Sequence, residues 1–327
     1  MKNELLTLTE ASARIRSGAI LSIAGPDALL AQLPRGTWIG GTTVYMLTDD
    51  GGARIEDRLF CSTFESATSA TLRHLTPDTL PDLATGQHDG GVTVLLIPAF
   101  SAAHSRFALE GTSYPGLFDQ PLMGWITGVP VEEIGTSAPA AYDGQTGTRH
   151  TEGAVALYLA LPAGAAPTLD IVNIFTPSDE AATTFTFPET GFSATSAQVN
   201  GETVALAPYL RERGIDIRLP LIANYAGALI NVSFQSIDDT TGEVTFYAPV
   251  IAGVEYRLAQ AMPDYAAAFA ETLGTGGDGM LSCNCILNYL HGDMAGKKTG
   301  RFTGPVTFGE IAYILLNQTL VKLDLAA

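Results

Sequence analysis

The chain has 327 residues and carries 34 acidic against 17 basic side chains, a formal net charge of −17. This negative charge disfavours nucleic acid and anionic membranes as partners, because both attract positively charged surfaces. With 46% hydrophobic and 16% charged residues, the composition is that of a well-buried globular protein. The length predicts two domains or two interlocked halves.

The amino terminus and the cysteines indicate the compartment. Residues 1–10 contain no apolar core followed by small residues, as a signal peptide would. The longest apolar runs fall far below the roughly 20 residues of a membrane span. Three cysteines are an odd and sparse set, which favours a reducing compartment over a disulfide scaffold. We therefore predict a cytoplasmic protein.

The first half of the chain alternates between helical and extended patterns. Helices are predicted over residues 8–15, with Thr7 or Thr9 as N-cap, and over 27–33 behind Pro26. Residues 92–100 form the strongest strand, and their unbroken apolar character predicts burial on both faces. We also predict strands over 19–24, 37–47, 53–61, 121–128 and 153–161, a helix over 101–109, and helical or irregular structure over 66–75 and 77–83.

The second half follows a change of composition at residues 177–191. Asn200-Gly201 predicts a type I′ hairpin turn after a strand over 194–199. Helices are predicted over 203–213 and 263–273, a glycine-rich turn over 274–279, and extended elements over 219–225, 228–236, 243–248, 255–259, 280–287 and 308–316. The whole pattern predicts an α/β to α+β fold, with two layered domains of mixed, largely antiparallel sheets and flanking helices.

Both tryptophans lie in similar contexts. The two segments are Trp38-Ile39-Gly40-Gly41-Thr42-Thr43 and Gly124-Trp125-Ile126-Thr127-Gly128. Glycine where a strand ends allows a ligand or another chain segment to approach the backbone closely. Two tight turns, or a crossing of two sheets, would need the same residues.

The familiar catalytic and cofactor motifs are missing from the sequence. It contains no Gly-x-Ser-x-Gly elbow, and its five histidines are too scattered for a zinc site. Residues 274–279 lie between a predicted helix and a predicted strand, the reverse of a dinucleotide-binding loop. We therefore predict no catalytic residue, no metal and no cofactor.

Two other features have competing interpretations. Cys283 and Cys285 share one face of a predicted strand, and burial as small apolar residues is favoured over reactivity. Glu310 follows a glycine inside an apolar element. It is either exposed at a helix start, which we favour, or buried and hydrogen-bonded.

The order of several short motifs resembles the FIST domains, proposed intracellular sensory modules. In the second half these are Val199-Asn200-Gly201-Glu202, Gly253-Val254-Glu255-Tyr256-Arg257-Leu258, Leu281-Ser282-Cys283 and Phe302-Thr303-Gly304-Pro305-Val306-Thr307-Phe308-Gly309-Glu310-Ile311. In the first half the two tryptophan segments flank the strand at 92–100, as two glycine turns do in the family. The family's cysteine strand commonly continues with arginine, whereas Asn284 follows here, so an anion gripped by that arginine is not expected.

The resemblance implies two units, residues 1–177 and 178–327, with a small-molecule pocket between them. It implies signal transduction by binding a ligand such as an amino acid or a similar metabolite, with a homo-oligomer or a signalling protein as further partners. The ligand-binding residues it implies are Gly40, Gly41, Thr42, Thr43, Gly124, Trp125, Cys283, Asn284, Phe308 and Glu310.

Two other functions compete with sensory binding. A partner-binding protein without a ligand ranks second. An enzyme that uses Cys283 beside a spatially adjacent His150 or His291 ranks last, because Cys–His pairs need only proximity in space. The contacts of Cys283 and the place of the deepest cleft discriminate among the three.

Overall fold

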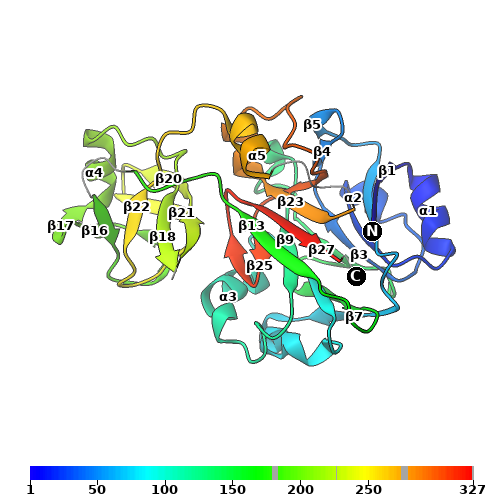
Figure 1. Cartoon of the computed structure of the whole chain (residues 1–327). Coiled ribbons are helices and arrows are strands. Elements are labelled where there is room, and N and C mark those ends of the chain that lie inside the picture. The colour runs from blue at the N-terminus through cyan, green and yellow to red at the C-terminus, as the bar shows by residue number, and fades with distance from the viewer. Residues whose placement is uncertain (179–182, 226, 274–278, 326–327) are drawn as a thin grey trace.

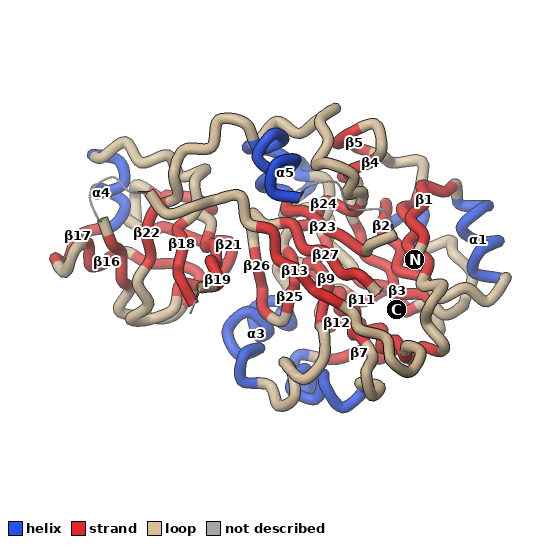
Figure 2. The backbone as a smooth tube through the Cα atoms, viewed as in Figure 1, coloured by secondary structure: helices blue, strands red, loops and turns tan. Residues whose placement is uncertain are grey.

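Three six-stranded sheets form the larger part of the molecule, and a smaller β-rich unit stands beside them (Figure 1). The structure, a computed structural model, describes residues 1–178, 183–225, 227–273 and 279–325. Strands dominate, and short helices lie around the sheets (Figure 2). The expected α+β fold with mixed, largely antiparallel sheets is confirmed.

The first two sheets each contain one parallel strand pair. In the first sheet the order is β1 (Lys2–Leu6), β6 (Leu59–Thr63), β2 (Leu21–Gly25), β3 (Trp38–Thr42), β10 (Ala141–Asp143) and β11 (Thr148–His150). In the second it is β26 (Ile314–Leu316), β25 (Glu310–Ala312), β9 (Leu122–Thr127), β8 (Val92–Pro98), β12 (Ala154–Ala160) and β7 (Ser69–Leu75). The pairs β2–β3 and β8–β9 are parallel.

The third sheet joins the two ends of the chain. Its order is β13 (Thr168–Val172), β27 (Leu320–Asp324), β23 (Leu281–Cys285), β24 (Gly304–Thr307), β4 (Tyr45–Thr48) and β5 (Gly51–Arg54). Side chains from all three sheets, among them Ile39, Leu96 and Val321, share one apolar core. The three sheets therefore form a single body.

The smaller unit has a core of its own. It contains the six-stranded sheet β17 (Glu202–Ala205), β16 (Ser196–Val199), β14 (Thr184–Thr186), β22 (Tyr256–Leu258), β18 (Leu221–Tyr225) and β19 (Ala228–Val232), and the three-stranded sheet β15 (Gly191–Ala194), β21 (Glu243–Val250) and β20 (Phe234–Asp238). Buried side chains such as Phe185, Leu221 and Phe246 fill the space between these sheets, and every member of this core lies within residues 185–256.

The helices cover the outer faces and the joint. They are α1 (Leu8–Arg16), α2 (Asp27–Leu30), α3 (Ala102–Glu110), α4 (Leu206–Glu212), α5 (Tyr265–Leu273) and α6 (Ile286–His291), with 3-10 helices η1 (Pro77–Gly86), η2 (Gly111–Ser113) and η3 (Val131–Glu133). Thr7 caps α1 in a capping box with Glu10. In the part of the chain that the structure describes, no helix has the length and apolar character needed to cross a membrane.

The structure divides the chain differently from the expected units 1–177 and 178–327. β24, β25 and β27 pair with β4, β9 and β13, so residues near the carboxyl end complete sheets begun in the first half. Residues 183–225 and 227–258 are an insertion into this body, and we call them the inserted unit. The remaining described residues are the body.

Secondary-structure predictions were confirmed where the pattern lay within a single segment of the chain. β8 is buried at every position, because alternate side chains enter two different cores. Asn200 and Gly201 both have positive φ, as the hairpin requires. The prediction was wrong at residues 69–75, which form β7, and after Cys285, where α6 replaces a continued strand. Most of the predicted turn at 274–279 lies outside the described residues.

Candidate functional site

The carboxyl ends of the parallel pairs β2–β3 and β8–β9 meet inside the body, and the third sheet contains a further parallel pair, β23–β24. β3 and β9, which carry the two tryptophans, are the second strands of the first two pairs. The N–H of Gly128, just past β9, donates to the carbonyl of Thr42 at 2.7 Å. Ligands of α/β sheets bind outside the carboxyl ends of parallel strands. The surface around this junction is therefore where a site is expected.

Nine of the ten predicted ligand residues are buried, and seven of these nine line none of the cavities described below. A Cβ on Gly41 would lie 2.8 Å from Nε1 of Trp125, and one on Gly124 would lie 1.8 Å from the carbonyl oxygen of Leu95. These two glycines therefore allow strands and a tryptophan to pack closely. The seven residues that line no described cavity are Gly40, Gly41, Gly124, Trp125, Cys283, Asn284 and Glu310.

The surroundings of Cys283 and Cys285 favour a structural role over a reactive one. The Cys283 thiol donates to the carbonyl oxygen of Gly124 at 3.5 Å, across β23 and β9. Burial raises the pKa of the Cys283 and Cys285 thiols well above the ordinary value, which disfavours the thiolate. Neither expected imidazole is a partner of Cys283 in the described part of the chain: His150 stacks on another histidine, and His291 lines a separate cavity.

Glu310 is buried on β25, so the favoured reading of an exposed helix start was wrong. Its Oε2 accepts from the hydroxyl of Thr319 at 2.8 Å and from the Thr319 N–H at 3.3 Å. Its Oε1 is buried without a hydrogen-bond partner among the described residues. Removal from water raises the pKa of this carboxyl to about 8, and the hydrogen bonds from Thr319 only partly oppose that effect.

The other three predicted residues line cavities. Thr42 and Thr43 line one of about 540 Å³ beside the carboxyl ends of β2 and β3. Their hydroxyls are already bonded, because Thr42 Oγ1 accepts from Ala140 N at 2.9 Å and Thr43 Oγ1 donates to Val306 O at 2.7 Å. Phe308 lines a different cavity, between the body and the inserted unit.

That cavity, the first cleft, has a volume of about 420 Å³. The body contributes apolar side chains to it, including Phe100, Ile134 and Phe308. The inserted unit contributes Phe192 and Tyr247, together with polar groups of its three-stranded sheet. Small-molecule sites are mostly apolar clefts with a few polar groups, and they favour domain interfaces, so this is the best candidate site.

Phe100 forms a strained turn at the edge of the first cleft. It follows β8 with φ 64°, a region that side chains other than glycine rarely occupy, and it is 56% exposed. Its ring packs edge-on against Phe308, with centroids 6.2 Å apart. Ser101 then caps α3 by accepting from the N–H of His104 at 3.1 Å. Strain of this kind is concentrated at functional sites.

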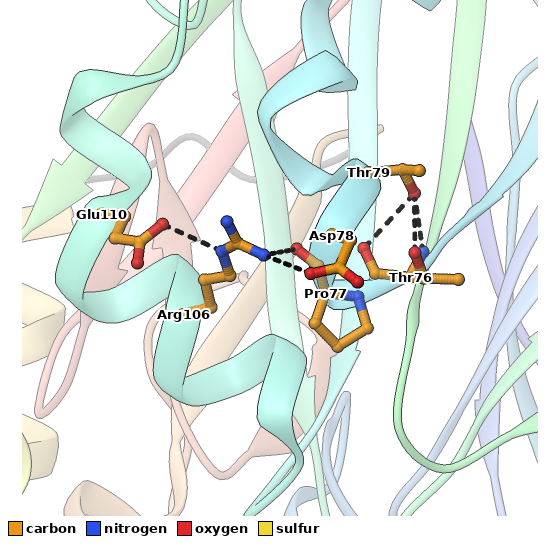
Figure 3. Close-up of polar contacts among 6 residues, drawn as sticks. All are labelled: Thr76, Pro77, Asp78, Thr79, Arg106 and Glu110. Carbon is orange, nitrogen blue, oxygen red and sulfur yellow. Dashed lines mark hydrogen bonds and ion pairs between the residues drawn. The ribbon is translucent and has the colours of Figure 1, made fainter.

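Helix α3 is held from the side opposite the cleft. Arg106 donates through Nη1 to the carbonyl of Pro77 and to Asp78, both at 2.8 Å, and through Nε to Glu110 at 2.9 Å (Figure 3). These bonds tie α3 to the start of η1. The helix that carries His104 therefore has a fixed position between η1 and the inserted unit.

A second cleft, of about 440 Å³, lies farther along α3. It is lined by Phe107 and Leu109 of this helix region, by the β25–β26 hairpin and by β19 of the inserted unit. All the large apolar side chains that are exposed in the described part of the chain line one of the two clefts. Those of the first cleft are Phe100, Ile134 and Leu290, and those of the second are Leu109, Phe118, Ile171 and Tyr225.

Sequence reasoning missed most of the first cleft. The available signal was Phe100-Ser101, a bulky residue and an N-cap where the strongest strand meets a helix. Nothing local in the sequence marks Phe192 or Tyr247 as its opposite wall.

The chain belongs to a family of unknown function, DUF6976, whose family model matches residues 6–326. No curated protein matches the chain, and no solved structure does. The resemblance to FIST domains stays a prediction.

Proposed function

We propose that this protein is a cytoplasmic sensory protein whose small-molecule ligand lies in the first cleft, between the body and the inserted unit. One observation carries the proposal: the exposed large apolar side chains gather at the two clefts instead of being scattered. A ligand that contacts both walls would bias the orientation of the inserted unit. A signalling protein or a second copy of the chain would then detect that orientation.

The charges of the first cleft limit the ligand. Glu243 is the one charged side chain among its described lining residues, and neither lysine nor arginine lines it. An amino acid would place its carboxylate in an apolar cleft without a cation to meet it, at a considerable cost in desolvation. We therefore favour an uncharged ligand over the amino acid that the resemblance implies.

A screen of uncharged apolar metabolites by thermal shift tests this proposal. Two phenylalanines make a matched pair, because Phe100 and Phe118 are each 56% exposed and lie in different clefts. We expect hits to raise the melting temperature of the wild type and of Phe118→Ala, and to lose this effect in Phe100→Ala. If no compound stabilises the wild type, or if Phe100→Ala responds like Phe118→Ala, ligand binding in the first cleft is refuted.

The same apolar side chains also favour a second candidate, a partner-binding protein without a small ligand. Sedimentation of the wild type and of Leu290→Asp separates the two functions. A concentration-dependent dimer that Leu290→Asp abolishes, together with an empty metabolite screen, would support partner binding. A monomer that responds to metabolites supports the sensory proposal.

A further inference from the structure

His104 holds a defined tautomer at the wall of the first cleft. It lies in the first turn of α3, and its Nδ1 accepts the backbone N–H of Phe100 at 3.3 Å. A neutral imidazole has one donor and one acceptor nitrogen. Because Nδ1 accepts here, the proton of the neutral ring is on Nε2.

This Nε2–H donor is buried, and it has no hydrogen-bond partner among the described residues. Burial lowers the pKa of His104 to about 4, so the ring stays neutral near pH 7. An unpartnered buried donor is costly, and native structures rarely keep one without a reason.

The inserted unit contacts the imidazole ring through Phe192. The ring of Phe192 packs against the imidazole at 64°, with centroids 6.3 Å apart, and both residues line the first cleft. Phe192 lies on β15 and is half-buried. An acceptor that enters beside it would reach Nε2 without moving α3, which Arg106 holds from the other side.

We propose that the ligand of the first cleft is an uncharged apolar molecule with a carbonyl oxygen, which accepts a hydrogen bond from His104 Nε2 when Phe192 turns aside. This inference rests on the proposed function and adds the ligand's chemical class. The aromatic and aliphatic lining binds the apolar part, and His104 fixes its orientation. An anionic acceptor is disfavoured because the donor is neutral and Glu243 is the charged group nearby.

Two fluorescent probes test this class without knowledge of the natural ligand. Prodan, 6-propionyl-2-(dimethylamino)naphthalene, is an uncharged ketone, and 6-propyl-2-(dimethylamino)naphthalene has the same skeleton with a CH2 group in place of the carbonyl. We expect the wild type to bind prodan about 5- to 10-fold more tightly, which is the worth of one neutral hydrogen bond to a buried donor. A hydrogen bond to its ketone shifts prodan emission to longer wavelength. Prodan bound to the wild type should therefore emit at longer wavelength than prodan bound to His104→Phe.

Two variants locate the effect. His104→Phe should bind both probes equally, with the red shift lost, while Phe192→Ala should raise the preference for prodan because it removes the ring that packs against the imidazole. Equal binding of both probes by the wild type would overturn the carbonyl inference and leave the cleft as a site. Binding of neither probe would instead count against the proposed function. The comparison within the wild type needs no variant, so a folding defect in His104→Phe would not block it.

Discussion

The buried carboxyl of Glu310 makes the stability of this protein depend on pH in an unusual direction. Its pKa is about 8 in the folded chain and near 4.5 in the unfolded one, so between these values the folded state binds more protons. Stability therefore falls as the pH rises through this window. The whole difference corresponds to about 5 kcal/mol, which is a ceiling because relaxation around the carboxylate would reduce it.

Glu310→Gln should remove this dependence. The amide keeps an oxygen for Thr319 and replaces the unpartnered Oε1 by a neutral group. Urea unfolding from pH 5 to pH 9 measures the effect. We expect the variant to match the wild type within roughly 1 kcal/mol at pH 5 and to exceed it by several kcal/mol at pH 9.

A surface acid supplies the matched control. Glu65 is exposed, so Glu65→Gln should leave the pH profile of unfolding unchanged. The reasoning is refuted if the free energy of unfolding of the wild type does not decrease between pH 5 and pH 8. It is also refuted if Glu310→Gln is the less stable protein at pH 9, because a paired and stabilising carboxylate would behave in that way.

Two further predictions concern the buried junction. Burial raises the thiol pKa of all three cysteines, so Ellman's reagent at pH 8 should label none of them in the folded chain and all of them in urea; rapid labelling of the folded chain would revive a reactive cysteine. Gly124→Ala should cost about 3 kcal/mol or more in urea unfolding, because its Cβ would lie 1.8 Å from Leu95 O. Gly191→Ala, whose Cβ would have its nearest contact at 3.8 Å, should be nearly neutral, and a similar loss in both variants would contradict the packing argument.

The fold could be predicted from the sequence where the cause is local. The apolar run of β8, the N-cap of α1 and the Asn200-Gly201 turn all act within a few residues. β7 could not be found in this way, because its partner β12 begins about 80 residues later and supplies the pairing. The inserted unit was hidden for the same reason: its limits depend on which distant strands the last residues join.

Glycine explains why most of the predicted ligand residues lie outside the first cleft. Small residues at strand ends mark a close approach, and the sequence does not say whether a ligand or a strand makes it. At Gly41 and Gly124 the approach is made by a tryptophan and by a backbone carbonyl. Phe308, one of the predicted ligand residues, lines the first cleft together with Tyr247, which belongs to the inserted unit.

The segment from residue 308 to residue 319 joins the first cleft to the contact between the two parts. Phe308 lines the cleft, and Gln318 accepts at Oε1 from the hydroxyl of Ser233 in the inserted unit, at 2.6 Å. Asn317 Oδ1 accepts from the Ser233 N–H at 2.9 Å. Two neighbouring residues of the body therefore bind Ser233 of the inserted unit. A ligand that binds equally well in every orientation of the inserted unit would send no signal, however tightly it binds. The sensory proposal therefore requires the ligand to contact both Phe308 and the inserted unit, since only such contacts change when the unit moves.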